Sequence, residues 1–157
     1  MKTRDLAYAA MFTAVIAASA ILTRFIPVTV IPFSIQSFMV FLAGGLLNRR
    51  SAVLSMAAYI LLGLVGIPVF ASPPYGGFGY FLVPSFGFLI GFVFTAWVVE
   101  WSLERCGNTL FAHMLSVVLG IGVMYLVGLP YLFGILKFYL GQAVDVAYII
   151  KIGFLPF

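Results

Sequence analysis

Charged residues rarely interrupt this sequence, and their scarcity constrains the fold more than any other feature. Of its 157 residues 8% are charged and 64% are apolar, whereas an ordinary soluble domain is roughly 25% charged and about 45–50% apolar. A globule of this composition would have too few polar side chains to cover itself in water. The sequence therefore predicts an integral membrane protein, whose length allows roughly five or six spans of about 20 residues each.

Prolines, glycines and charged residues divide the chain into five apolar stretches, because they stop helices or resist burial in lipid. We predict spans over residues 6–23, 35–47, 51–70, 81–101 and 109–129. The second is so short that it spans only by tilting or with local thinning of the bilayer. Residues 131–157 are mixed in character. The first stretch imitates a signal peptide, but it is longer than a usual signal core, so a retained span is the simpler interpretation.

Basic residues set the expected orientation. Counted on alternate sides of the membrane, five lie on the side of the N-terminus, namely Lys2, Arg4, Arg49, Arg50 and Arg105, against Arg24, Lys137 and Lys151 on the other. Because cytoplasmic loops carry an excess of Lys and Arg, we expect a cytoplasmic N-terminus in the cell membrane. Two loops rich in proline and glycine, 25–33 and 71–84, then lie outside.

Residues with catalytic or metal-binding potential are few. His113, the only histidine, has no acid nearby in sequence, so we predict no enzyme; it is either a partnered polar residue of the bundle or part of a proton relay. The glycines at 76–79 lack the Lys-Ser/Thr of a phosphate-binding loop, so the chain is not expected to hydrolyse ATP by that route, and any energy input comes from a partner or an ion gradient. Cys106 has no second cysteine, and the basic residues form no patch for nucleic acid. We expect neither a cofactor nor a metal.

The loop at 71–80 is the main candidate for a ligand site. It contains three glycines and two prolines, and irregular backbone at membrane depth is tolerated only where protein or a water-filled cavity satisfies it. Its amides and carbonyls would then be available to a ligand. In the alternative interpretation it is a tight turn, and Tyr75, Phe78 and Tyr80 form an interfacial aromatic belt. Polar Ser34 and Gln36 stand at the mouth of a neighbouring span.

Small residues recur every four positions in two places. Ala10, Ala14 and Ala18 form one stripe, and Gly87 and Gly91 form another. Such stripes let helices approach closely. They serve either internal packing of the bundle or docking of a separate membrane protein.

The middle of the chain carries a specific pattern of proline, glutamine, paired arginine and glycine. It runs through IPFSIQSFMVFLAG at 31–44, NRRSA at 48–52 and YILLGLVGIPVFA at 59–71, and continues at 76–82, 84–92 and, more weakly, 125–131. The order and spacing of these blocks resemble the BioY family, the biotin-binding S-components of energy-coupling factor (ECF) transporters. The resemblance covers nearly the whole chain.

This resemblance implies an all-α membrane protein, a compact bundle of the ECF S-component type. The family has six helices; here we expect about five and a partial C-terminal segment, in one membrane domain over 1–157. Such a protein captures biotin on its outer face and delivers it inward when docked on a transmembrane coupling subunit driven by two ATPases. The implied biotin-binding residues are Ser34, Gln36, Gly76, Gly77, Tyr80, Ser85, Phe86 and Gly87, and the implied docking residues are Ala10, Ala14 and Ala18.

Biotin's valerate carboxylate calls for a cation, for which Arg24, Lys137 and Lys151 are the outer-side candidates. The chain also departs from the family pattern. It has Ser-Phe-Gly-Phe after Pro84 where Thr-Gly-Gly-Tyr is common, and Ser34 where threonine is usual. Past a motif like that at 155–157 the family continues into a Pro-Gly-Asp segment and a helix with a lysine, which we expect to be absent here. The alternatives are an S-component for another small vitamin and a non-transporting membrane assembly subunit.

Overall fold

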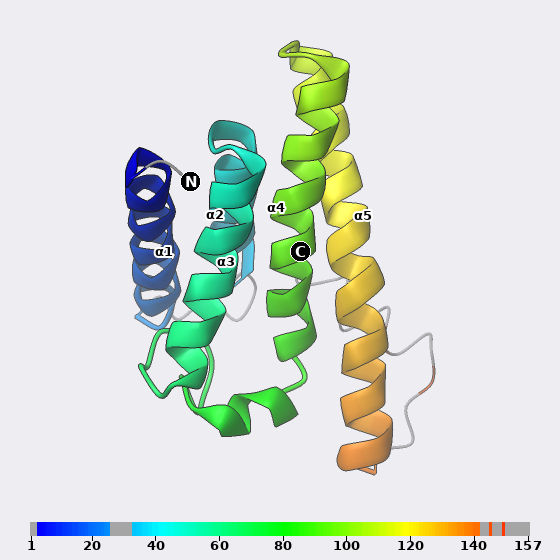
Figure 1. The fold of residues 1–157 in the computed structure, drawn as a ribbon. Helices are drawn as coiled ribbons and strands as arrows, with labels where there is room; N and C mark the ends of the chain where they lie inside the picture. Colours follow the sequence, from blue (N-terminus) through cyan, green and yellow to red (C-terminus); the bar gives the residue numbers. More distant parts are fainter. Residues whose placement is uncertain (1–2, 26–32, 142–144, 146–148, 150–157) are drawn as a thin grey trace.

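The computed structural model describes residues 3–25, 33–141, 145 and 149, and for residues 33 and 34 the backbone alone (Figure 1). The described residues are mainly helical. The helices are α1 (Thr3–Thr23), α2 (Phe33–Leu46), α3 (Arg49–Leu64), α4 (Phe86–Cys106) and α5 (Leu110–Gly134), with a 3₁₀ turn η1 (Phe78–Leu82) and a π-helical turn η2 (Ile135–Tyr139). Most of the first loop, Lys151 and the motif at 155–157 lie outside the described residues.

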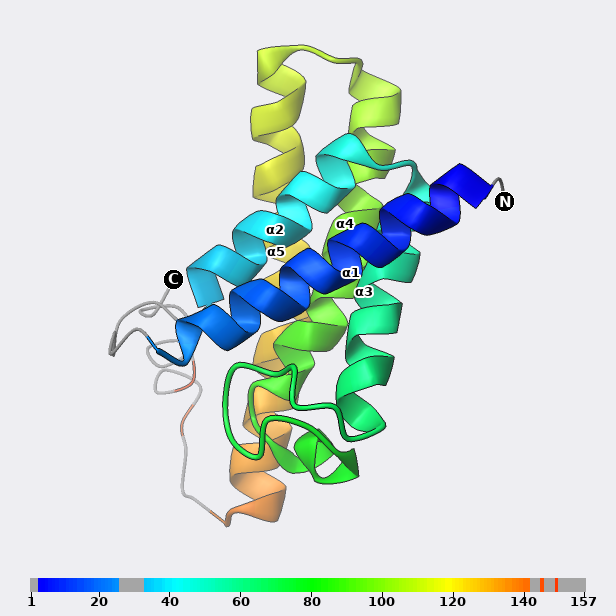
Figure 2. The ribbon, with the colours of Figure 1, turned by 90° about the vertical axis from the view of Figure 1, so that its left-hand side faces the viewer.

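The helices run up and down between two ends of the bundle. One end, here the loop end, holds the segment 65–85 together with the C-terminal ends of α1 and α5 (Figure 1). The other, the turn end, holds the short α2–α3 and α4–α5 connections. Figure 2 shows α1 and α2 inclined to the long pair formed by α4 and α5. Because α4 contacts α2, α3 and α5, it forms the centre of the bundle.

Within the part of the chain that the structure describes, three helical segments are long and apolar enough to cross a membrane: Thr3–Thr23, Phe86–Cys106 and Leu110–Tyr139. Helix α2 has 14 residues and at 1.5 Å per residue extends about 21 Å, less than the roughly 30 Å of a hydrocarbon core. This length confirms the prediction of a short second span.

Three predicted boundaries were wrong. The third span ends at Leu64 rather than near residue 70, since Gly66 follows with a φ of +109°. The fourth begins at Phe86 rather than 81, because the residues before it form η1. The fifth continues through Pro130 to Gly134 instead of stopping at the proline. In lipid a broken helix would leave several backbone groups unpaired, which costs more than the one hydrogen bond that proline lacks.

Two polar residues of the α2–α3 connection, Asn48 and Arg49, have partners on other helices. Asn48 caps α3, and its amide nitrogen donates to Asp5 Oδ1 at 3.2 Å. The Arg49 Nε donates to Glu100 Oε2 at 2.8 Å, and its Nη2 pairs with Glu104. These contacts tie the starts of α1 and α3 to the end of α4, and they pair the Arg49 charge with two carboxylates at the turn end.

The glycine stripe of α4 is an internal packing surface. A Cβ added at Gly87 would lie 2.3 Å from Tyr131 Cβ, and one at Gly91 would lie 3.1 Å from the Met124 carbonyl oxygen. Both neighbours belong to α5. Of the two interpretations of this stripe, the close α4–α5 contact selects internal packing.

Candidate functional site

Five buried side chains from five segments meet at the loop end. They are Gln36 on α2, Tyr59 on α3, Phe70 from the connecting segment, Tyr80 on η1 and Phe86 on α4, and none is more than 2% exposed. We call them the loop-end cluster. The cluster joins four of the sequence blocks, at 31–44, 59–71, 76–82 and 84–92, although the first and last lie far apart in sequence.

Hydrogen bonds satisfy the polar tips of this cluster. The Gln36 Nε2 donates to Tyr59 Oη at 2.8 Å, and Tyr59 Oη donates to the Val69 carbonyl at 3.2 Å. The Tyr80 Oη lies 2.8 Å from Ser72 Oγ and 3.4 Å from Ser85 Oγ. Buried polar groups need such partners. The cluster therefore has a layer of hydrogen-bonded polar groups enclosed by aromatic rings.

Phe70 is the centre of the aromatic walls. Its ring centroid lies 5.7 Å from that of Tyr59, edge to face, and 4.1 Å from that of Tyr80. The ring fits because Gly63 has no side chain: a Cβ there would lie 2.1 Å from Phe70 Cζ. The fold of the connecting segment therefore depends on one glycine near the end of α3.

We expect Gly63→Ala to lower the free energy of unfolding by roughly 1–3 kcal/mol, the usual effect of overpacking a core. Thermal unfolding of the purified protein in detergent checks this as a lower melting temperature. Gly45→Ala is the matched control, because a Cβ at Gly45 meets no atom within 4 Å and alanine favours a helix over glycine. An unchanged melting temperature for Gly63→Ala would show that the Phe70 ring relaxes freely.

The glycines of the candidate loop allow the backbone to fold back onto α3. A Cβ at Gly76 would lie 2.6 Å from the Ile67 carbonyl oxygen. Gly77 has a φ of +93°, and its N–H donates to the Gly63 carbonyl at 2.6 Å. The Gly77 amide is therefore occupied by the protein in this structure. The binding roles of Gly76 and Gly77 stay predictions.

The predicted aromatic belt is divided by the structure. Phe78 is 74% exposed, as an interfacial side chain would be, whereas Tyr80 is 2% exposed and belongs to the loop-end cluster. Tyr80 therefore faces the protein rather than the membrane interface. The same segment thus contributes an exposed aromatic side chain, Phe78, and a buried one in the cluster, Tyr80.

The remaining predicted ligand residues lie around the cluster. Ser85 immediately precedes α4, beside Tyr80, and Phe86 packs edge to face on Tyr80 with ring centroids 6.2 Å apart. Gly87 faces α5, as described above. Ser34 is in the first turn of α2, and its side chain lies outside the described residues.

The cation candidates differ in their surroundings. The Arg24 guanidinium donates to the carbonyls of Pro68 and Phe70 and lies 4.3 Å from the Tyr75 ring centroid. The Lys137 Nζ, on η2, lies 5.0 Å from the Phe133 ring centroid. These contacts of Arg24 and Lys137 are to backbone carbonyls and aromatic rings rather than to carboxylates.

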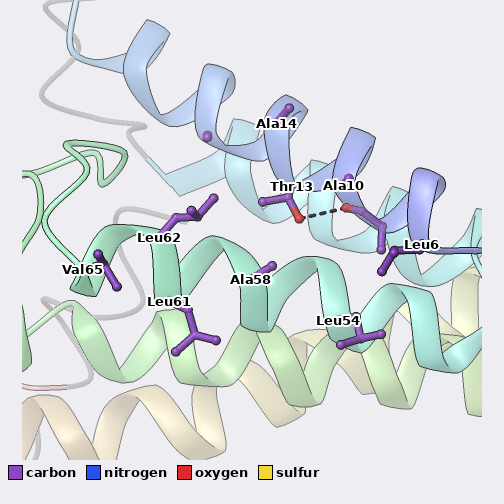
Figure 3. Close-up of a pocket in the computed structure, with 11 residues that line it drawn as sticks. Leu6, Ala10, Thr13, Ala14, Leu54, Ala58, Leu61, Leu62 and Val65 are labelled. Carbon is purple, nitrogen blue, oxygen red and sulfur yellow. Dashed lines mark hydrogen bonds between the residues drawn. The ribbon is translucent and has the colours of Figure 1, made fainter.

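The alanine stripe lies on the surface of α1. Ala10, Ala14 and Ala18 are exposed, and Ala10 and Ala14 line a groove between α1 and α3 (Figure 3). We call this the α1–α3 groove; its volume is about 520 Å³, and its lining is Leu6, Ala9, Ala10, Thr13, Ala14, Ala17, Leu54, Ala58, Leu61, Leu62 and Val65. Internal packing belongs instead to the flanking face, where buried Thr13 donates to the Ser55 carbonyl at 3.0 Å. The stripe itself is not covered by another helix in the described part of the chain.

His113 is a partnered polar residue near the start of α5. Its Nδ1 lies 2.9 Å from the Thr109 carbonyl oxygen, one turn earlier. Among the described residues, no three His, Cys, Asp or Glu side chains gather as a metal site would require.

Sequence reasoning missed Tyr59 and Phe70 as members of the site. Tyr59 could have been identified because it is a tyrosine inside an apolar span, and its hydroxyl needs a hydrogen-bond partner when buried. Phe70 carried no such signal, because it is one of 17 phenylalanines.

Comparison with known proteins matches the whole chain. The model of the BioY family matches residues 1–157. The chain is 37% identical over 153 residues to the probable biotin transporter BioY of Lysinibacillus sphaericus, covering 97% of this chain and 76% of the relative. It is 35% identical over 154 residues to the biotin transporter BioY of Thermotoga maritima, covering 98% and 85%.

A solved structure agrees with the fold. The S-component for biotin from an ECF-type ABC transporter superposes with a TM-score of 0.71 at 26% identity, covering 99% of this chain and 85% of that one. The predicted all-α S-component bundle is therefore confirmed. Several apolar helices in a transporter fold make this a multi-pass membrane protein, and the match over its whole length shows that the chain belongs to the BioY family.

Proposed function

We propose that this protein is the S-component of an ECF transporter and captures biotin for uptake across the cell membrane. The observation that carries the proposal is its similarity, over 97–98% of its length, to proteins named biotin transporters. The loop-end cluster supplies a site whose chemistry suits the ligand. The BioY family is one of transporters rather than enzymes, and biotin enters as substrate rather than cofactor.

The chemistry of biotin matches the cluster in two parts. The ureido ring offers two N–H donors and a carbonyl, which need hydrogen-bonding partners when buried; the Gln36 amide and the Ser85 hydroxyl are suitable. The fused thioether ring is apolar and suits the rings of Tyr80 and Phe86. The proposed site comprises Ser34, Gln36, Gly76, Gly77, Tyr80, Ser85, Phe86 and Gly87.

Access to this site requires movement of the segment 65–85. Gln36 and Tyr80 are 1% and 2% exposed, so a ligand reaches them only when the segment shifts away from the cluster. Such a shift would break the Gly77–Gly63 hydrogen bond and the contacts of Tyr59 with Val69 and Phe70, which join the segment to α3. We infer that the loop end faces outward and the N-terminus lies in the cytoplasm, as the distribution of Lys and Arg favours.

The partners in this proposal are a transmembrane coupling subunit and two ATPases. The exposed stripe Ala10, Ala14 and Ala18 and the adjoining α1–α3 groove form the docking surface. Small side chains there allow a partner helix to approach the backbone of α1 closely, which favours association in lipid. ATP is hydrolysed by the partners.

Equilibrium binding of labelled biotin to the purified protein in lipid nanodiscs tests this function. We expect saturable binding that unlabelled biotin displaces and that thiamine and riboflavin do not. Displacement by another vitamin in preference to biotin would support an S-component of different specificity. Absence of binding to any vitamin by a folded sample would support the assembly-subunit alternative.

A further inference from the structure

Arg24 connects the end of α1 to the segment that leads from α3 to η1. Its Nε donates to the Phe70 carbonyl at 3.1 Å, and its Nη2 donates to the same oxygen at 2.6 Å and to the Pro68 carbonyl. The guanidinium carbon lies 4.3 Å from the centroid of the Tyr75 ring. One side chain thus holds this segment by its backbone at two carbonyls and by an aromatic ring.

These contacts fix the orientation of the guanidinium. Its donors lie in one plane as a rigid fork, and the two carbonyls and the aromatic face together define that plane. The turn is closed further by the Phe70 N–H, which donates to the Tyr75 carbonyl at 2.9 Å. The positive charge of Arg24 therefore rests on neutral backbone and ring groups, a geometry suited to holding a loop.

The held segment carries a wall of the loop-end cluster. Phe70, whose carbonyl accepts from Arg24, places its ring 4.1 Å from the Tyr80 ring centroid. The neighbouring Val69 carbonyl accepts from Tyr59, which also accepts from Gln36. A displacement of the segment at residues 68–70 therefore moves the aromatic wall and the polar layer together.

Arg24 also adjoins the helix that forms the docking surface. Ala14 lies ten residues earlier on α1, about 15 Å along the helix axis at 1.5 Å per residue. A helix of this length moves as one body, so a partner that displaces α1 relative to α3 also displaces Arg24. The α1–α3 groove, which such a partner would fill, lies between the same two helices.

We propose that Arg24 is a positioning residue that holds the biotin site closed and couples it to docking on α1. This inference rests on the proposed function. With α1 in the position seen here, the Arg24 contacts keep Phe70 against Tyr80 and biotin is retained. When the coupling subunit packs on the groove and displaces α1, Arg24 moves with it and either drags the Pro68 and Phe70 carbonyls along or loses its hydrogen bonds to them. In both cases Phe70 shifts away from Tyr80 and the affinity for biotin falls.

The first test separates positioning from direct binding of the carboxylate. In nanodiscs, we expect Arg24→Gln to speed dissociation of labelled biotin about 10-fold, a typical size for a coupled effect. Biotin amide, which lacks the carboxylate, should be affected by the same factor. Arg24→Lys should be impaired as strongly, because a point charge does not bridge two carbonyls in a fixed plane. Loss confined to biotin, with biotin amide unchanged, would show that Arg24 binds the carboxylate and overturn the proposal.

Hydrogen exchange without ligand provides a readout that does not depend on biotin. We expect the amides of Phe70, Tyr75 and Gly77 to exchange faster in Arg24→Gln, with those of α4 and α5 unchanged. Arg105→Gln is the matched control, since Arg105 lies 4.5 Å over the Trp101 ring at the turn end. Faster exchange throughout the bundle, or none at the three amides, would contradict a local positioning role.

The coupling itself is measured by comparing biotin affinity in the free protein and in its complex with the coupling subunit. We expect docking to lower the affinity of the unsubstituted protein and to leave that of Arg24→Gln nearly unchanged. An equal ratio in both proteins would refute the coupling. If the unsubstituted protein binds no biotin, the proposed function fails, and the hydrogen-exchange result still decides whether Arg24 holds the segment.

Discussion

Replacing Gln36 by leucine is expected to lower the affinity for biotin by roughly 10- to 100-fold, or about 1.4–2.8 kcal/mol. The two side chains have similar size, so the cluster keeps its packing. The polar ring of the ligand, however, loses a partner inside a site that is sealed from water, where Gln36 itself is 1% exposed. An unpaired polar group in such a site costs its full desolvation. Titration of labelled biotin in nanodiscs measures the change.

Two further variants distinguish a direct contact from an indirect one. Tyr59→Phe removes the hydroxyl that accepts from Gln36; if Gln36 acts only by orienting Tyr59, both substitutions should weaken biotin equally and the double variant should add nothing. Ser37→Ala is the control, because Ser37 is a buried polar residue of the same helix whose Oγ contacts Met124 Sδ at 3.9 Å, outside the cluster. Unchanged affinity in Gln36→Leu would remove this residue from the proposed site.

The helices were predictable because lipid leaves a backbone few alternatives. Each apolar stretch had to satisfy its own N–H and C=O groups, so the described residues form five α-helices where five apolar stretches were found. The same constraint explains the mistaken stop at Pro130. Helix boundaries that depend on tertiary contacts, such as the start of α4 after η1, carried no comparable signal.

The two small-residue stripes show what spacing alone does not decide. Both repeat every four residues, yet Ala10 and Ala14 face outward, while Gly87 and Gly91 lie against α5. Only the arrangement of the other helices determines which stripe is covered. Exposure is a property of the whole bundle, so it could not be derived from one helix.

Sequence indicated which residue types gather at the loop end better than it indicated their contacts. Gln36, Tyr80 and Phe86 were expected at a common site, and the structure brings them together at the loop end. Arg24 was expected to be available for a carboxylate, but it bonds to carbonyls 44 and 46 residues away. Backbone carbonyls are present at every position, so sequence does not indicate which of them a distant arginine will reach.

Replacing Ala14 by leucine is expected to weaken association with the coupling subunit by roughly 10- to 100-fold and to abolish uptake, while biotin binding to the free protein stays intact. Ala14 is exposed on the wall of the α1–α3 groove, so the larger side chain points away from the bundle core and does not disturb the loop-end cluster. In a complex it would separate two helix backbones that small residues otherwise allow to touch, at a cost of about 1–3 kcal/mol.

Co-purification with a tagged coupling subunit and uptake of labelled biotin by cells measure the two halves of this prediction. Val15→Phe is the matched control: Val15 is the next residue on α1, is 38% exposed and does not line the groove. It adds comparable volume outside the groove, and assembly should be unchanged. Ala18→Leu tests how far the docking surface extends, since Ala18 is exposed but lies beyond the groove lining. Equal loss of biotin binding and assembly in Ala14→Leu would indicate that α1 is displaced within the protein, whereas normal assembly would place the coupling subunit on another face.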